Sequence, residues 1–409
     1  MYIADFHIHS KYSRATSKNM NIEELAKWAK YKGLNLIGTG DFTHFLWAHE
    51  LKEKLVPSDR KGIYNYNGTD FILTTEVCTI FEKRGKIKKI HNIIFLSSLE
   101  LLDKINQALE KYGDLNVDGR AILQIEAKNL VKVVKSIDEK GFIVPAHIWT
   151  PHFSLFGSNS GFDIIEDCFE NMTEEIFALE TGLSSDPYMN WQLSSLDDFT
   201  LISNSDAHSP SKLGREANIF KSPFDFLQLR KILREKDISQ FLFTIEYFPE
   251  EGKYHFDGHR NCKICFSPEE SIKNKNICPI CKKKITIGVM HRIKELADRK
   301  EGEKPEKAIP FYKLIPLDQL IGFIFEKPVE SLSVQNKYLD IVQKVGTEFD
   351  ILLNISEENL SKVIEEEIVE GIMKVRKEKV KIQPGYDGEF GKITILLDSD
   401  KSKDQQTLF

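Results

Sequence analysis

The chain has 409 residues with a formal net charge of −6, and 41% of the residues are hydrophobic and 29% are charged. At roughly 100–200 residues per domain, this length predicts two or three domains, and the composition excludes a disordered or fibrous protein. No apolar run approaches the roughly 20 residues that a membrane-spanning helix needs. The first ten residues, MYIADFHIHS, have Asp and His where a signal peptide would have basic and apolar segments. We therefore expect a cytoplasmic protein.

Residues 1–247 alternate short apolar runs with amphipathic segments. The runs are YIADFHIH, LNLIGTGD, FILTTE, IHNIIFL, GFIVPAH, IFALETG and LISNSDAH. Apolar residues at helical spacing predict helices over 21–31, 99–111, 127–140 and 225–236. A strand followed by a helix, repeated along the chain, predicts an α/β fold with parallel strands, in either a barrel or a doubly wound sheet.

Each apolar run carries a metal-ligand type of residue at or near one end. These residues are His7, His9, Asp41, Glu76, His91, His147, Glu180, Asp206 and His208. In a closed α/β barrel the carboxyl ends of the strands converge at one mouth, whereas an open sheet would spread them along an edge. Because these side chains need to meet, the pattern favours a barrel with one polynuclear metal site at its mouth.

Imidazole nitrogens mixed with carboxylate oxygens indicate a hydrolytic site for divalent ions such as Zn, Mg or Mn. Two or three such ions polarise a phosphoryl oxygen and lower the pKa of a bound water, so we expect attack of activated water on a phosphate ester. Glu76 is the candidate bridging ligand, because a carboxylate has two oxygens to share. Asp186 is a further catalytic candidate at the mouth, and a turn residue before Pro187 is the alternative reading of it.

Two C-x2-C pairs predict a structural zinc ion in the segment 248–300. The ligands would be Cys262, Cys265, Cys278 and Cys281, with twelve residues between the pairs. Four thiolates complete a tetrahedral shell, which leaves no open position for a water molecule. Such an ion would stabilise a module that is too small to fold on an apolar core alone.

The same region is basic: residues 253–300 contain twelve Lys and Arg against five Asp and Glu, a net charge of +7. A basic zinc module is typical of proteins that contact nucleic-acid phosphates, and Lys283 and Arg292 are candidates for such contacts. A lid over the barrel mouth is the alternative role for this module.

The last part of the chain is predicted to be mostly helical. Apolar spacing indicates helices over 317–325, 336–346 and 357–379, and a strand over 392–397. The segment GYDGEFG, which includes Tyr386 and Gly388, could approach a nucleic-acid backbone closely or form an ordinary turn. We expect four parts: a barrel (1–247), a zinc module with a basic helix (248–300), a helical region (301–400) and a tail (401–409).

The motifs DFHIHS, GTGDFTH, TTE, IHN, PAHIWTP and SNSDAHS, in this order, resemble a PHP (polymerase and histidinol phosphatase) domain. The resemblance implies a distorted (β/α)7 barrel that holds up to three divalent metal ions. The ligands that it implies are His7, His9, Asp41, Glu76, His91, His147, Asp206 and His208. The second motif has Asp41-Phe42 where the family often has Asp-His.

A narrower resemblance covers nearly the whole chain. KYHFDGHRNCKICFSPEES, VMHRIKELADR and PGYDGEFGKI resemble the endonuclease Q family of DNA repair enzymes. This implies nicking of DNA on the 5′ side of a deaminated base (uracil, hypoxanthine or xanthine) or of an abasic site. The alternative is a PHP-type phosphatase acting on a small phosphate ester, although such an enzyme has no need of about 160 extra residues.

The final residues QQTLF resemble the start of a sliding-clamp (PCNA) interaction motif. Gln405 and Leu408 have the expected separation, but the chain ends at Phe409, before the usual aromatic pair. The implied partners are therefore DNA with a damaged base and the clamp, with a frayed terminus as the alternative for the tail.

Overall fold

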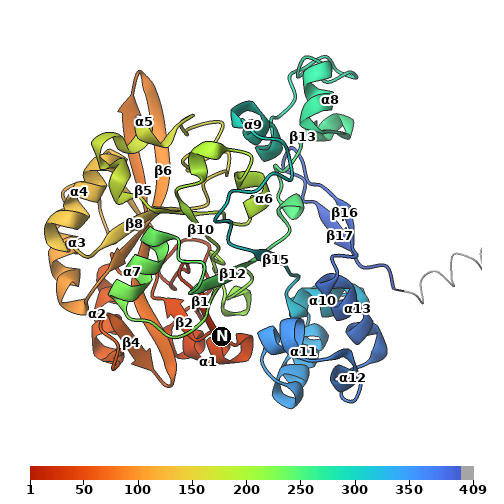
Figure 1. Ribbon diagram of the computed structural model, residues 1–409, viewed down its shortest axis with the longest axis horizontal. Coiled ribbons are helices and arrows are strands. Elements are labelled where there is room, and N and C mark those ends of the chain that lie inside the picture. The colour runs from red at the N-terminus through yellow and green to blue at the C-terminus, as the bar shows by residue number, and fades with distance from the viewer. Residues whose placement is uncertain (398–409) are drawn as a thin grey trace, which may run out of the picture.

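Short strands alternate with helices in the first half of the chain, and the computed structural model describes residues 1–397 (Figure 1). Five strands form a hydrogen-bonded path: β1 (Tyr2–Asp5), β2 (Leu36–Gly38), β5 (Thr69–Lys83), β6 (Lys86–Leu96) and β8 (Phe142–Pro145). Two more strands, β9 (Ala178–Glu180) and β10 (Thr200–Ile202), pair in parallel with each other.

Backbone contacts beyond the strand ends close this path into a ring. The amide of Ile148, after β8, donates to the carbonyl of Glu180 in β9 at 3.1 Å. On the other side, Ala207, after β10, forms a bridge with Ile8, and its carbonyl accepts from the amide of His9 at 3.0 Å. The ring β1-β2-β5-β6-β8-β9-β10 confirms the predicted distorted barrel of seven strands.

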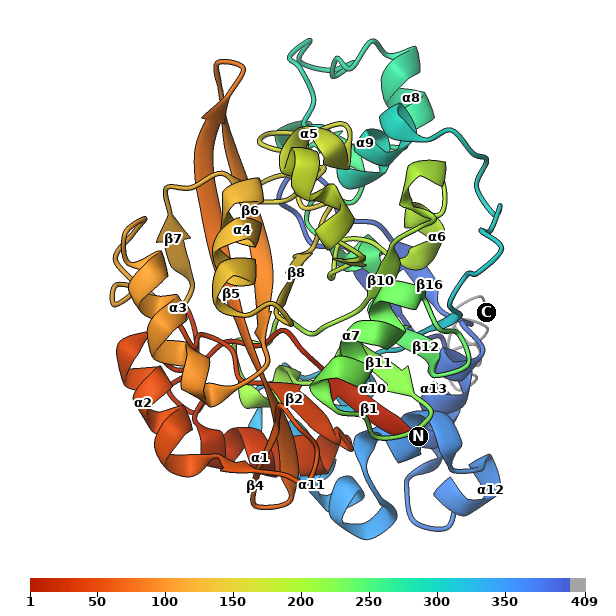
Figure 2. The same ribbon diagram turned by 60° about the vertical axis from the view of Figure 1, so that its left-hand side comes forward.

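The prediction of parallel strands throughout is wrong for the third and fourth apolar runs. They form one long antiparallel hairpin, in which Leu73 pairs with Leu96 and Lys83 with Lys86. Arg84 (φ 52°) and Gly85 (φ 72°) supply the two left-handed residues that a tight hairpin turn requires. Figure 2 shows this hairpin projecting beyond the barrel.

Further strands lengthen the sheet on both sides of the ring. They are β3 (Val56–Pro57), β4 (Ile63–Tyr66), β7 (Ala121–Leu123), β11 (Ala217–Phe220), β12 (Phe241–Glu246) and β15 (Phe311–Lys313). β11 pairs antiparallel with β1, and β15 pairs with β12. A strand from beyond residue 300 therefore belongs to the barrel sheet.

Helices cover the outside of the barrel (Figure 2). They are α1 (Ile22–Lys32), α2 (Phe45–Lys54), α3 (Leu102–Leu109), α4 (Ala127–Ile137), α5 (Ile165–Phe169), α6 (Pro187–Asn190) and α7 (Phe226–Glu235). α1, α3, α4 and α7 lie where apolar spacing predicts them. No helix within residues 1–397 is long and apolar enough to cross a membrane.

The barrel interior is filled by apolar side chains from its strands. One buried cluster joins Ala4 and Phe6 to residues of the other ring strands: Leu36, Ile72, Ile93, Val144, Ala178 and Ile202. β1 ends at Asp5, so His7 and His9 lie beyond the strand.

The zinc module contains β13 (Asp257–His259), β14 (Ile264–Phe266), α8 (Pro268–Lys273) and α9 (Val289–Leu296). Arg292 of α9 joins it to the barrel, because the guanidinium donates to the carbonyls of Phe156 and Phe162, both at 3.1 Å, and to Asp163. These bonds fix the module beside the loop that follows β8 (Figure 1).

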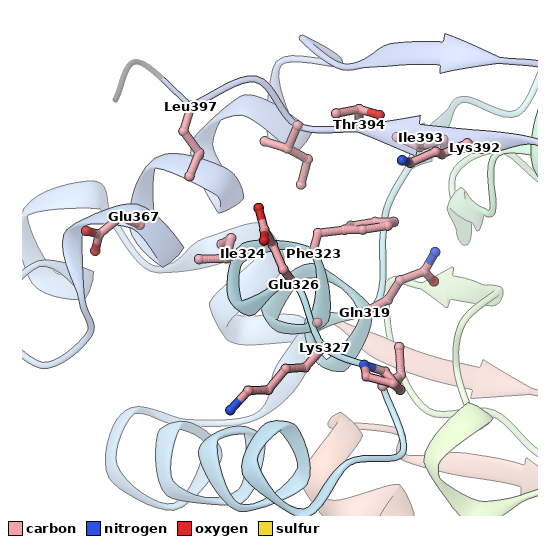
Figure 3. A pocket seen from close by; sticks show the side chains of 14 residues that line it. Gln319, Phe323, Ile324, Glu326, Lys327, Glu367, Lys392, Ile393, Thr394 and Leu397 are labelled. Atoms are coloured by element: carbon pink, nitrogen blue, oxygen red, sulfur yellow. The ribbon is translucent and has the colours of Figure 1, made fainter. Parts of the chain in front are cut away.

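The C-terminal helices are α10 (Leu317–Phe325), α11 (Leu332–Val345), α12 (Glu357–Leu360) and α13 (Glu366–Arg376). The single helix predicted over 357–379 is wrong: the chain breaks between α12 and α13 with no Pro or Gly to mark the break. A cavity of about 750 Å³ lies between α10 and the segment Lys392–Leu397, lined by Phe323, Ile324 and Ile393 (Figure 3).

A final hairpin of β16 (Lys381–Gln383) and β17 (Lys392–Thr394) precedes Leu397. Its loop contacts the zinc module, since the amide of Phe256 donates to the carbonyl of Gly385 at 3.0 Å. Two segments beyond the predicted boundary at residue 300 therefore contact earlier parts of the chain: β15 pairs with the barrel sheet, and this loop contacts the zinc module.

Candidate metal centre at the barrel mouth

Three overlapping groups of metal-ligand atoms lie together where the strands end. They are His7, His9 and Glu76; His9, Asp206 and His208; and Glu76, His91 and His147. Within each group the ligand atoms lie within 4.8 Å of one another. Because His9 and Glu76 each belong to two groups, the three groups form one continuous cluster.

Glu76, in the middle of β5, is the centre of this cluster. Its Oε1 lies 2.6 Å from His91 Nδ1 and 3.0 Å from His147 Nε2. Its Oε2 lies 3.3 Å from His9 Nε2 and 3.7 Å from His7 Nε2. A carboxylate that faces imidazoles on both of its oxygens suits the bridging role predicted for it.

Two buried carboxylates orient the imidazoles from behind. Both oxygens of Glu180 lie 3.0 Å from His7 Nδ1, and Asp41 Oδ1 lies 3.0 Å from His9 Nδ1. Each ring therefore turns its Nε2 toward the cluster, an arrangement common in metal sites. Asp41, predicted as a ligand, belongs to none of the three groups and lies behind His9.

His7 provides the clearest test of whether a metal fits. The residue is 1% exposed, yet its Nε2 has no hydrogen-bond partner among the described residues. A buried nitrogen with no partner costs free energy unless something binds it. A divalent ion between His7 Nε2, His9 Nε2 and Glu76 would satisfy this nitrogen.

Three of the site residues have left-handed backbone conformations, with φ of 42° at Asp41, 31° at His147 and 47° at Asp206. Such conformations are uncommon for residues other than glycine and persist only where the surrounding structure enforces them. Each follows the end of a strand, so the sharp turn directs the side chain into the mouth.

The charges of the cluster balance one another. Burial works against protonation of His7, but Glu180, Asp206 and Glu76 outweigh burial and hold its pKa well above the ordinary value. Burial alone would raise the pKa of Asp206, yet His7 and His9 hold it far below its usual range. Burial lowers the pKa of His91 to about 4, which keeps this imidazole in the neutral form that binds metals.

One side of the cluster faces solvent. The side chains of Asp206 and His208 are 27% and 33% exposed, whereas those of His7, His9 and Glu76 are at most 1% exposed. Arg120 lies on this open side, with its Nη1 3.3 Å from Glu76 Oε2 and its side chain 30% exposed. Arg120 was not predicted as a site residue, because it follows a turn and belongs to no ligand pattern.

Asp186 lies outside the cluster. Its Oδ1 accepts a hydrogen bond from the amide of Met189 at 2.9 Å and so caps α6, and its Oδ2 pairs with Lys313 Nζ at 2.8 Å. This carboxylate is engaged on two sides, which favours the alternative reading of Asp186 as a turn residue before Pro187.

The candidate DNA contacts of the second half are placed differently from one another. Lys283 is exposed, whereas the guanidinium of Arg292 is occupied by the barrel loop. Gly388 (φ 88°) sits in a tight turn, and a Cβ on Gly258 would lie 2.3 Å from the Tyr386 ring. The glycine-rich segment therefore makes its close approaches to its own chain.

The zinc-ligand group differs from the predicted set by one residue. His259, Cys262, Cys278 and Cys281 gather within 4.8 Å, and Cys265 lies outside the group. In the β13–β14 hairpin His259 pairs with Ile264, while Cys265 pairs with Gly258. Because neighbouring residues of a strand face opposite sides, Cys265 points away from the face that carries His259.

This arrangement predicts different outcomes for two cysteine variants. We expect Cys278→Ser to lose the bound zinc and the fold of the module, because a buried ligand is removed. Cys265→Ser should keep one zinc per chain. Zinc content by atomic spectroscopy and the thermal unfolding curve measure both effects, and equal zinc loss in the two variants would restore the four-cysteine set.

Residues Gln405, Leu408 and Phe409, on which the clamp motif rests, lie outside the described residues.

The family model of the MJ0043 C-terminal domain matches residues 316–379. The Methanocaldococcus jannaschii protein MJ0043 is 35% identical over 254 residues, and the match covers 60% of this chain and 31% of that relative. The chain thus spans less than a third of that protein's length. The Bacillus subtilis protein YqxK is 29% identical over 407 residues, which cover 95% of this chain and 98% of YqxK.

The barrel and the cluster at its mouth define a PHP-fold protein. The solved lesion-specific endonuclease PfuEndoQ from Pyrococcus furiosus superposes with a TM-score of 0.85 at 31% identity, over 98% of both chains. A second solved structure is a complex of endonuclease Q with a 27-mer duplex that has an abasic lesion at the active site. It superposes with a TM-score of 0.83 at 31% identity, over 97% of this chain and 96% of that chain. The chain belongs to the endonuclease Q family.

Proposed function

We propose that the protein is a metal-dependent DNA endonuclease that nicks the backbone 5′ of deaminated bases (uracil, hypoxanthine or xanthine) or of abasic sites. The observation that carries the proposal is the likeness, over 97% of the chain, to an endonuclease Q with an abasic lesion at its active site. The ligand cluster at the barrel mouth supports the same chemistry.

The residues of the cluster have distinct parts in this proposal. His7, His9, Glu76, His91, His147, Asp206 and His208 would hold divalent ions. Bound ions supply an activated water and polarise the phosphoryl oxygen. Glu180 and Asp41 keep the rings of His7 and His9 turned toward the cluster, so that these nitrogens need no reorganisation when substrate binds.

A groove beside the cluster offers a surface for DNA. A cavity of about 540 Å³ between the barrel loop and the zinc module is lined by His152, Asn159 and Arg292. A second cavity of about 300 Å³ shares Asn159 and Arg292 and reaches the β5–β6 hairpin, where Lys83, Arg84, Lys86 and Lys88 gather. Lys83 and Arg84 are paired with Glu170 and Asp167, whereas Lys86 and Lys88 form no ion pair among the described residues. These two cations suit the phosphates of a duplex.

The larger cavity approaches the metal cluster along the chain. His152, in its lining, precedes Phe153, whose carbonyl accepts a hydrogen bond from the amide of His91 at 2.9 Å and whose ring lies 5.0 Å from that of His91. A damaged base must first leave the stack, at a cost of about a few kcal/mol, and this cost is lowest for bases that pair poorly.

The experiment that tests the proposal uses end-labelled duplexes with one uracil, hypoxanthine, xanthine or abasic site and an undamaged control. With Mg²⁺ or Mn²⁺ we expect one nick 5′ of each lesion, and none in the control or after chelation. Hydrolysis of a small phosphomonoester without any lesion-dependent nick would contradict the proposal and favour a phosphatase.

The clamp interaction is a separate prediction. If the tail tethers the enzyme to PCNA, a chain that ends at Lys403 should lose clamp binding, because Gln405, Leu408 and Phe409 are absent. Its nicking of free duplex should not change. Surface plasmon resonance against immobilised clamp measures the difference, and equal binding by the full and shortened chains would remove the hypothesis.

A further inference from the structure

Arg120 contacts the cluster but is neither a predicted ligand nor a partner that holds a ligand ring from behind. Its Nη1 lies 3.3 Å from Glu76 Oε2, and 30% of the side chain is exposed. Asp206 and His208, the exposed members of the cluster, have side chains exposed to a similar extent. A substrate that reaches the cluster from solvent meets this guanidinium.

The backbone before Arg120 is clamped to the loops that carry the ligands. The amide of Arg120 donates to Asp118 Oδ1 at 3.2 Å, and the amide of Gly119 donates to the carbonyl of Tyr12 at 3.1 Å. A Cβ at Gly119 would lie 2.4 Å from Asp41 Oδ2, so only glycine fits against this carboxylate. The position of Arg120 over the cluster is thus built into the fold.

Most of the donors of this guanidinium remain available. A guanidinium has five N–H donors in a fixed plane. Within residues 1–397 the side chain makes one hydrogen bond, to Glu76. The remaining donors belong to a side chain that is 30% exposed. Their planar fork matches two oxygens of a phosphate, which an ammonium group cannot do.

We propose that Arg120 is a catalytic residue that binds a non-bridging oxygen of the scissile phosphodiester and stabilises the charge that develops there during attack. The inference rests on the proposed endonuclease function and names the anion-binding part of the same site. Its alternative is that Arg120 only neutralises Glu76. The two roles differ in geometry: neutralisation needs a positive charge, whereas binding phosphate oxygens needs the fork.

Arg120→Lys separates these roles because it keeps the charge and removes the fork. We expect Arg120→Lys and Arg120→Gln both to nick a lesion duplex about 10²–10³-fold more slowly in single-turnover assays, the loss typical of removing one oxyanion donor. Both should keep the metal content of the unaltered protein and bind inorganic phosphate at least tenfold more weakly when metal-loaded. Arg234→Gln, an exposed arginine on α7, is the matched control.

Two results would overturn the inference: full activity and phosphate binding in Arg120→Lys, or a loss of metal that accounts for the loss of activity. Hydrolysis of the small diester bis(p-nitrophenyl) phosphate is measured in parallel. If the unaltered protein cleaves this diester but no lesion duplex, the endonuclease proposal fails. The effect of Arg120→Lys on the diester and on phosphate binding then still decides the role of Arg120.

Discussion

Replacing Asp206 by asparagine is expected to slow nicking of a lesion duplex by about 10³-fold or more while the variant still binds that duplex. Asp206 Oδ1 lies 3.0 Å from His9 Nε2 and 3.7 Å from His7 Nε2, on the open side of the cluster. Loss of a charged ligand removes several kcal/mol of charge stabilisation, and about 1.4 kcal/mol corresponds to tenfold in rate.

Asparagine is the better substitution here than alanine. Asp206 has φ of 47°, a conformation that asparagine adopts more readily than alanine. A loss of activity therefore reflects the missing charge and not a strained backbone. His7→Ala removes a buried member of the same cluster and should lose activity to a similar extent.

The measurement pairs single-turnover nicking with duplex binding by fluorescence anisotropy and metal content by atomic spectroscopy. Asp59→Ala, a carboxylate with a side chain 93% exposed, is the matched control and should retain activity. Unchanged nicking by Asp206→Asn would mean that the cluster does not perform the reaction.

The cluster was predictable because its members follow a rule of position. His147 and Asp206 lie in the loops that follow buried apolar strands, two and four residues past the strand ends, and Glu76 lies within a strand. Strand ends converge at a barrel mouth, so residues far apart in sequence could be assigned to one site. The fold class followed from the same runs, because the strand ends can meet at one site only if the sheet closes into a barrel.

The sequence failed where a side chain's role depends on its neighbours in space. Asp41 was chosen as a ligand on type and position, but which side of His9 it contacts is set by packing. His259 and Cys265 lie on opposite faces of the β13–β14 hairpin, and the spacing of the cysteines alone does not show which face carries the ligands. Arg120 belongs to no recognisable motif. Its position depends on backbone contacts of residues 119 and 120 with Tyr12, which is distant in sequence, and with Asp118, which is part of no sequence pattern.

The antiparallel β5–β6 hairpin was missed for a different reason. The segment between the third and fourth runs begins with apolar residues and ends in the mostly charged residues 82–89, which include the turn residues Arg84 and Gly85. The ladder extends to Lys83 and Lys86. Hydrophobic periodicity gives no strand signal in these charged residues, so the two runs were not recognised as the arms of one hairpin.

A buried pair of carboxyls next to the barrel predicts an unusual dependence of stability on pH. Ala217 pairs with Ile245 across β11 and β12, which brings Glu216 opposite Glu246, and both residues are fully buried. Burial raises the pKa of Glu246 to about 8, and burial together with Glu246 raises that of Glu216 well above its usual range. The fold therefore holds these carboxyls protonated at neutral pH.

The sign follows from which state loses its proton first. In the unfolded chain Glu246 ionises near its ordinary pKa of 4.5, whereas in the fold it keeps its proton until about pH 8. Between these values the unfolded state binds fewer protons, so the free energy of unfolding falls by about 1.4 kcal/mol per pH unit. This contribution is fully present below about pH 4.5 and is lost as pH rises through about 8.

Glu246→Gln cannot ionise and should lose this part of the slope. A glutamine retains one acceptor oxygen for the hydroxyls of Thr181 and Thr244, which lie 3.0 and 2.5 Å from the carboxyl oxygens. We therefore expect the variant to gain stability relative to the unaltered protein as pH rises from 5 to 8. Urea unfolding at each pH measures the difference, in which contributions from the cluster histidines cancel. Glu367→Gln, which replaces an exposed glutamate on α13, is the control. Parallel curves of unfolding free energy against pH for Glu246→Gln and the unaltered protein would show that Glu246 is ionised in the fold.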